Sequence, residues 1–108
     1  MKNREGKYLA PTPDGIVAAA AAMSKSIPAD LRFSLVDATD VDAYPIVGAV
    51  WAIVPADLTA SAGAKELVAF LRWATHEGQA FVGELRFAPL PPDLVKRIDE
   101  RLDSVRLK

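Results

Sequence analysis

The sequence predicts an α/β chain in which mostly helices surround one or two buried strands. The evidence for a strand is residues 46–54, which carry no charge and are apolar on both faces of a period-2 pattern. A strand of this kind needs cover on both sides, usually from helices over a parallel or mixed sheet. The chain supplies helices but few partner strands. This shortage of partner strands indicates that the chain is part of a larger protein.

Length and composition fit one ordered domain. A chain of 108 residues suffices for one core and buries about two thirds of its unfolded surface. Thirteen Lys and Arg oppose fourteen Asp and Glu, which gives no basic surface for nucleic acid or anionic lipid. The lack of cysteine excludes disulfides, thiolate metal sites and thiol catalysis, but it assigns no compartment.

Neither a signal peptide nor a membrane span is expected. A leader needs an apolar run of about 7–15 residues, whereas residues 2–7 are polar and Pro11 and Pro13 interrupt the next stretch of the chain. The longest apolar run, residues 46–54, is far shorter than the about 20 residues of a span.

The first helix is expected over residues 13–24. Thr12 fits the N-cap, Pro13 fits the first helical position, and Asp14 faces the positive end of the helix dipole. The alanine-rich residues 18–22 favour helix and allow another backbone to approach closely. We expect a buried structural helix.

Residues 31–36 are a candidate short strand or irregular edge, and a polar connection comes after them. Asp37, Asp40 and Asp42 in this connection invite a calcium interpretation. An EF-hand loop needs Gly at its sixth position and Glu at its twelfth. Counted from Asp37, these positions hold Asp42 and Gly48. We therefore expect a solvated turn and no metal site.

Three further helices are expected, over residues 64–77, 79–85 and 92–106, with a proline-stiffened strap before the last. The first of them has apolar residues at the i, i+3, i+4 and i+7 spacing of an amphipathic helix. Ser61 is a plausible cap at its start. Gly78 suits the left-handed position that ends a helix.

The single histidine, His76, lies beside Glu77 near the end of a predicted helix. Catalysis would need a nucleophile or a metal that the neighbouring sequence does not specify. A protonated imidazole is also favourable at the negative end of a helix dipole. We expect no catalytic residue here.

Two other features could bind a ligand. Residues 61–64 at a helix start could offer N–H groups to an anion, but the nearest basic residue is Lys65 and there is no Gly-rich phosphate motif. Trp51 and Trp73 could stack a ligand, but aromatic residues in such patterns are expected to belong to the core. No binding residue is assigned from either feature.

Five segments succeed one another in a specific order: N-R-E-G-K-Y-L-A-P-T, I-P-A-D-L-R, A-Y-P-I with the apolar strand, F-L-R-W-A-T-H-E-G-Q, and L-R-F-A-P-L-P-P-D-L-V. Together with the alanine-rich helix, this order resembles the C-terminal third of the phosphate-binding periplasmic proteins of phosphate ABC transporters. The resemblance runs from about Asn3 to Val105.

The resemblance implies part of a two-lobed periplasmic-binding-protein fold of type II, in which inorganic phosphate binds between the lobes and is delivered to a membrane permease. Residues 1–42 would be a remnant of the second lobe. Residues 43–108 would hold the crossing strand and the C-terminal helices of the first lobe, so that the chain is a single incomplete domain. A periplasmic or cell-surface location is also implied.

The family holds phosphate with Ser and Thr hydroxyls, helix N-terminal N–H groups, an Asp and an Arg, all from parts upstream of this region. No residue here matches those motifs, so the resemblance assigns no phosphate-binding residue, catalytic residue, metal ligand or cofactor. The export signal or lipid-anchor cysteine of the family is also missing. We expect a fragment or a truncated reading frame.

Two functional hypotheses fit these observations. The first is a structural and hinge-forming C-terminal portion of a phosphate-binding protein, which by itself binds phosphate, or a related oxyanion, poorly or not at all. The second is a stand-alone interaction or homo-oligomerisation module in which Trp51 and its apolar neighbours form the contact surface. An enzyme built around His76 and Glu77 is a third, weaker hypothesis.

Overall fold

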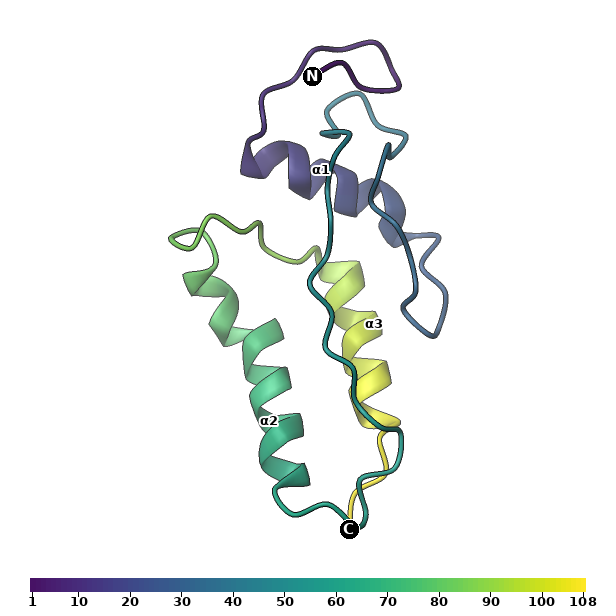
Figure 1. The fold of residues 1–108 in the computed structure, drawn as a ribbon, viewed down its shortest axis with the longest axis vertical. Helices are drawn as coiled ribbons and strands as arrows, with labels where there is room; N and C mark the ends of the chain where they lie inside the picture. The colour runs from purple at the N-terminus through teal and green to yellow at the C-terminus, as the bar shows by residue number, and fades with distance from the viewer.

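Three α-helices and one 3₁₀-helix make up the regular structure of the computed structural model, which describes residues 1–108. They are α1 (Pro13–Ser24), α2 (Ala64–Thr75), η1 (Glu77–Phe81) and α3 (Pro92–Asp103). Helices α2 and α3 lie side by side, and α1 crosses at one end of this pair (Figure 1). The molecule is elongated, with extents of 51 × 29 × 18 Å. None of the helices combines the length and apolarity that a membrane crossing requires.

The prediction of buried strands is wrong. Pairing is limited to two isolated bridges, Lys2 with Tyr8 and Asp57 with Arg106. Residues 46–54 pair with no strand, and residues 31–36 are irregular, with a left-handed φ of 61° at Leu31. A ladder needs a neighbouring strand to exchange hydrogen bonds with, and this chain provides none. The regular structure of the chain is therefore almost entirely helical.

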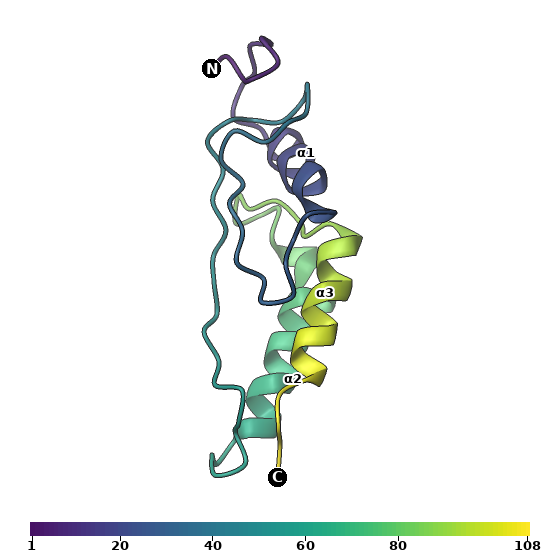
Figure 2. The same ribbon diagram turned by 90° about the vertical axis from the view of Figure 1, so that its right-hand side faces the viewer.

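The uncharged residues 46–54, here called the central ribbon, are mostly exposed. Exposure reaches 86% at Val50 and 97% at Ile53. The ribbon is covered mainly near its two ends, where Val47 belongs to one small core and Val54 packs against another. Figure 2 shows it running along one side of the molecule, apart from α2 and α3. The apolar pattern predicts burial, but most of the cover is not supplied by this chain.

Two small cores lie at the two ends of the ribbon. The α1 cluster contains Ala19, Ala20, Leu35, Ala38, Ala43 and Val47. The α2–α3 cluster contains Leu58, Ala64, Val68 and Leu102. The alanines of α1 allow the close approach that the sequence predicts, since Ala19 is fully buried and the Gly15 carbonyl accepts a hydrogen bond from the Tyr44 N–H at 3.1 Å.

The surface is large for a chain of this mass. Its accessible area is 7390 Å², whereas a compact monomer of 11.6 kDa exposes about 5,800 Å². The radius of gyration is 15.6 Å, against about 13 Å expected for this length. Only 18 of 108 residues are buried, and no large side chain is completely buried. The chain's own segments do not cover its apolar faces.

Helix bounds agree with the local sequence signals at the starts and less well at the ends. The predicted bounds of α1 are confirmed, although the Thr12 side chain makes no capping hydrogen bond. Helix α2 ends at Thr75, and η1 takes the place of the predicted helix over residues 79–85. Helix α3 ends at Asp103, before the predicted residue 106.

Ser61 and Gly78, the residues predicted to cap the two ends of α2, do not cap it. Its N-cap is Gly63, with φ at 74°, and not Ser61. Glycine occupies this left-handed conformation without the steric cost of a Cβ. Gly78 is not left-handed; it is buried within η1, against the ring of Trp73. A close contact, and not a backbone conformation, accounts for the glycine at this position.

Candidate functional site

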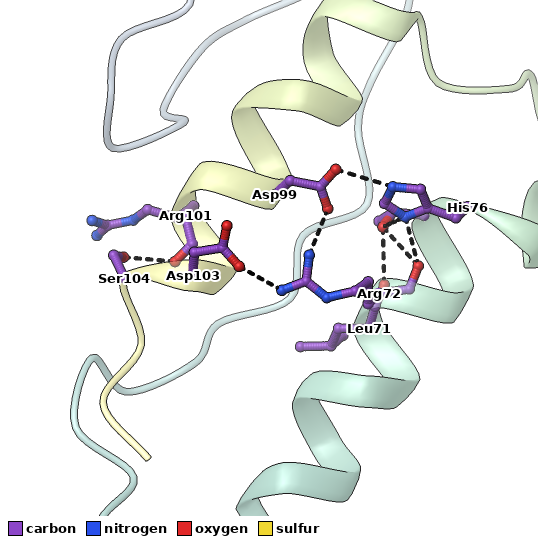
Figure 3. A network of polar contacts seen from close by, with 8 residues as sticks. Leu71, Arg72, His76, Asp99, Arg101, Asp103 and Ser104 are labelled. Atoms are coloured by element: carbon purple, nitrogen blue, oxygen red, sulfur yellow. Dashed lines mark hydrogen bonds and ion pairs between the residues drawn. The ribbon is translucent and has the colours of Figure 1, made fainter.

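A network of polar side chains lies between α2 and α3 (Figure 3). Arg72 Nη1 donates to Asp99 Oδ1 at 3.0 Å, and Arg72 Nη2 donates to Asp103 Oδ1 at 2.8 Å. His76 Nε2 lies 3.0 Å from Asp99 Oδ2. Asp99 therefore receives two partners from the α2 side. This network fastens the end of α2 to the C-terminal half of α3.

The network favours the protonated form of His76. Its Nδ1 lies 2.8 Å from the carbonyl oxygen of Arg72. This hydrogen bond is the main cause that raises the pKa of His76; desolvation opposes it, and the charge and hydrogen bond of Asp99 add to the rise. Both ring nitrogens face acceptors, and only the protonated ring donates from both.

A catalytic interpretation of His76 has one apparent support. The hydroxyl of Thr75 lies 3.1 Å from His76 Nδ1, and together with Asp99 this gives an acid, a base and a hydroxyl in a row. However, the same hydroxyl bonds the carbonyls of Leu71 and Arg72, each at 3.1 Å. The hydroxyl is thus held against the helix backbone, and the nitrogen beside it carries a proton. The geometry supports a structural role.

Glu77 and the start of α2 do not complete a site. Glu77 makes no side-chain hydrogen bond in the network and contributes only weakly, by its charge, to the raised pKa of His76. At the start of α2 a shallow hollow of about 240 Å³ is lined by Ser61, Gly63, Ala64, Lys65, Glu66 and Lys108. Glu66 opposes an anion there, and no buried polar side chain points to a ligand.

The aspartates of the polar connection pair with the N-terminal segment. Arg4 Nε lies 3.2 Å from Asp37 Oδ2, and Lys7 Nζ bonds Asp42 Oδ1. Asp40 Oδ1 accepts from the Asp42 N–H at 2.8 Å. No three acidic, histidine or cysteine side chains gather as metal ligands would. The connection's charges serve to hold the chain's first residues.

Sequence reasoning missed the residue that organises this end of the molecule. Asn3 is buried, and its Nδ2 donates to the carbonyls of Asp40, Val41 and Ala43 at 3.3, 2.9 and 3.2 Å. Its Oδ1 accepts from the Lys7 N–H at 2.9 Å. Nothing in the sequence marks the three carbonyl partners, which lie 37–40 residues away. A lone asparagine in a turn-rich segment is the only signal.

The two tryptophans are not core residues, contrary to the prediction. Trp51 is 50% exposed and meets Phe33 edge to face, with ring centroids 5.0 Å apart. Trp73 is 45% exposed, and its ring centroid lies 6.0 Å from that of Phe70 and 6.1 Å from that of Phe81. Both groups leave apolar surface in solvent, in keeping with the uncovered ribbon.

The chain is similar to bacterial phosphate-binding proteins. No family model matches it. It is 30% identical over 99 residues to the "Phosphate-binding protein PstS" of Xylella fastidiosa (strain Temecula1), and 26% identical over 98 residues to the protein of that name from Haemophilus influenzae (strain KW20). These regions cover 92% and 91% of this chain but 27% and 29% of the relatives.

The resemblance found in the sequence is thereby confirmed. The chain spans less than a third of the length of the curated relatives it matches.

Proposed function

We propose that this chain is the C-terminal portion of the solute-binding protein of an ABC phosphate importer, with a structural and hinge-forming role. The observation that carries the proposal is the similarity to phosphate-binding proteins, which extends over 92% of this chain and only 27% of the relative. A periplasmic location and a membrane permease as partner are parts of the same proposal. So is a two-lobed binding-protein fold of type II in the complete molecule.

The arrangement of the two cores supports the hinge role. The α1 cluster ends at Val47 and the α2–α3 cluster begins with contacts to Val54, so the central ribbon is the connection between them. Residues 1–42 would then belong to the second lobe and residues 43–108 to the first. A segment that crosses between two lobes is where a hinge would act.

The phosphate ligands, in this proposal, lie in the part of the protein upstream of this region. Phosphate is bound by several charged or N–H donors that converge on one point. Four arginines of this chain form ion pairs with its own aspartates: Arg4, Arg32, Arg72 and Arg106. Their donors are directed at carboxylates of the chain itself.

A chimera tests the proposal. This chain replaces the matched region of the Xylella fastidiosa relative, and inorganic phosphate is titrated into the chimera in a calorimeter. We expect the chimera to bind phosphate and the relative truncated before the matched region to bind far less. A folded chimera that binds no more phosphate than the truncated relative would contradict the proposal. The intact relative is the positive control.

A further inference from the structure

We propose that His76 and Thr75 form a proton-operated cap on the C-terminal end of α2. The protonated ring of His76 caps the Arg72 carbonyl, and the neutral ring exchanges that carbonyl for the Thr75 hydroxyl. The inference rests on the geometry of the ring and its neighbours. It goes beyond the proposed function and does not depend on it.

The Arg72 carbonyl lacks the donor that a continuing helix would give it. That donor would be the N–H four residues later, which belongs to His76. The His76 backbone leaves the helical region, with φ at −120° and ψ at −94°, and its N–H donates to the Trp73 carbonyl at 3.1 Å. The His76 side chain takes the vacant place, with Nδ1 2.8 Å from the Arg72 oxygen. This side chain is therefore a C-terminal cap.

A second side chain caps the same end of α2 and does not titrate. Gln79 Nε2 donates to the Ala74 carbonyl at 2.8 Å. Gln79 Oε1 accepts from the Leu90 N–H at 2.8 Å, which ties the end of α2 to the residues before α3. An amide keeps its donors and acceptor at every pH. Of these two side-chain caps, only the one on the Arg72 carbonyl can respond to pH.

Asp99 determines which nitrogen of the His76 ring loses its proton. Its Oδ2 lies 3.0 Å from Nε2, and a carboxylate only accepts, so Nε2 keeps its hydrogen in both states of the ring. The proton that leaves for water is therefore the one on Nδ1. The bare Nδ1 then faces the Arg72 oxygen, and two acceptors at 2.8 Å repel each other.

The Thr75 hydroxyl is a donor within reach of the neutral ring. Its oxygen lies 3.1 Å from His76 Nδ1 and 3.1 Å from each of the carbonyl oxygens of Leu71 and Arg72. A hydroxyl has one hydrogen, so these three acceptors compete for it. When Nδ1 is bare, the hydroxyl turns to it. The Arg72 carbonyl then loses both side-chain donors, and the last turn of α2 opens more easily.

The charges around the ring favour the capped state. Arg72 on α2 is paired with Asp99 and Asp103 of α3, and Glu77 at the start of η1 adds a further negative charge. The hydrogen bond to the Arg72 carbonyl raises the pKa of His76, desolvation opposes it, and Asp99 and Glu77 add to the rise. The cap is therefore present at acid pH and is lost as pH rises through the folded pKa.

NMR of the ring nitrogens in the 108-residue chain tests the inference, since His76 is the only histidine. We expect the neutral ring to carry its hydrogen on Nε2. Thr75→Val keeps the shape of the side chain but removes the hydroxyl that stabilises the neutral ring. The pKa of His76 should then rise by about half a pH unit, as expected for one hydrogen bond. Thr75→Ser keeps the hydroxyl, is the matched control, and should leave this pKa unchanged.

Amide hydrogen exchange tests the consequence for the helix end. Protection factors are measured about one pH unit below and above the measured pKa of His76. We expect those of the last turn of α2 to fall by about threefold at the higher pH, as the loss of one hydrogen bond predicts. Those of α1 are the internal control and should not change. His76→Gln, which does not titrate, should abolish the difference.

Three results would overturn the inference. A neutral ring with its hydrogen on Nδ1 would keep the cap at high pH. A pKa that Thr75→Val lowers or leaves unchanged would show that the hydroxyl does not donate to the neutral ring. Equal protection of the α2 end on both sides of the pKa would show that the cap does not hold it. If Thr75→Val does not fold, the wild-type tautomer and exchange decide. None of these results bears on phosphate binding.

Discussion

His76 and Asp99 lie 3.0 Å apart, Nε2 to Oδ2, where the end of α2 meets α3. This contact joins two helices through side chains that are about one third exposed. It also couples the helix pair to pH, because one partner titrates near neutrality.

The first prediction concerns that pH dependence. The hydrogen bond to the Arg72 carbonyl, with the charge of Asp99, raises the pKa of His76 above 6.5 in the folded chain. Its contribution to stability is therefore fully present below pH 6.5 and is lost as pH rises through the folded pKa. Urea unfolding should show His76→Gln less stable than wild type at low pH and equal to it at high pH. As His76 is the only histidine, its NMR titration is unambiguous, and a pKa below 6.5 would contradict the prediction.

The second prediction separates the two aspartates of the network. Asp99→Asn weakens the contacts to both Arg72 and His76, whereas Asp103→Asn affects Arg72 alone. Partly exposed ion pairs contribute about 0.2–1 kcal/mol each, so Asp99→Asn should lower the free energy of unfolding by about 1 kcal/mol. The control Asp103→Asn, at a side chain 71% exposed, should cost less. Equal effects of the two variants in urea unfolding would show that Asp99 does not join the helices.

The third prediction concerns Asn3. Asn3→Asp replaces an NH₂ group that donates to three carbonyls with a carboxylate oxygen that repels them. Leaving buried polar groups without partners costs about 1–3 kcal/mol, and we expect a loss of that size in thermal or urea unfolding. The neighbouring Arg4→Ala removes an exposed ion pair and should cost under about 1 kcal/mol. An Asn3→Asp variant as stable as Arg4→Ala would rule out the anchoring role.

The fourth prediction concerns the contact between Gly78 and Trp73. A Cβ at position 78 would lie 3.0 Å from Cζ3 of Trp73 and 3.1 Å from its carbonyl oxygen. Overpacking of this kind costs about 1–3 kcal/mol, so Gly78→Ala should lower the unfolding midpoint. Gly83→Ala, where a Cβ meets nothing within 4 Å, is the control and should be close to neutral. If the two alanine variants unfold together, the contact does not constrain residue 78.

Local features of the fold could be predicted from the sequence. Pro13 after Thr12 marks the start of α1, and the periodic apolar residues locate α2 and α3. These signals are local, because helical hydrogen bonds and caps join residues a few positions apart. Helix ends are less predictable, because the side-chain packing of Trp73 on Gly78 replaces the expected left-handed cap.

The long-range features could not be predicted. Asn3 bonds the carbonyls of Asp40, Val41 and Ala43. Asp99 bonds Arg72 and His76, and no sequence pattern encodes either set of spacings. The prediction for the ribbon failed for a different reason. Its apolar faces correctly indicate that it needs cover, but periodicity does not say which chain supplies the cover. The pattern predicts that residues 46–54 are buried, and in this chain most of them are exposed.

The central proposal is that this chain is part of a phosphate-binding protein and that the phosphate ligands lie outside it. The most direct measurement is a calorimetric titration of the 108-residue chain alone with inorganic phosphate. We predict no heat beyond dilution. Saturable binding with micromolar affinity would show that these residues form a complete phosphate site and would contradict the account.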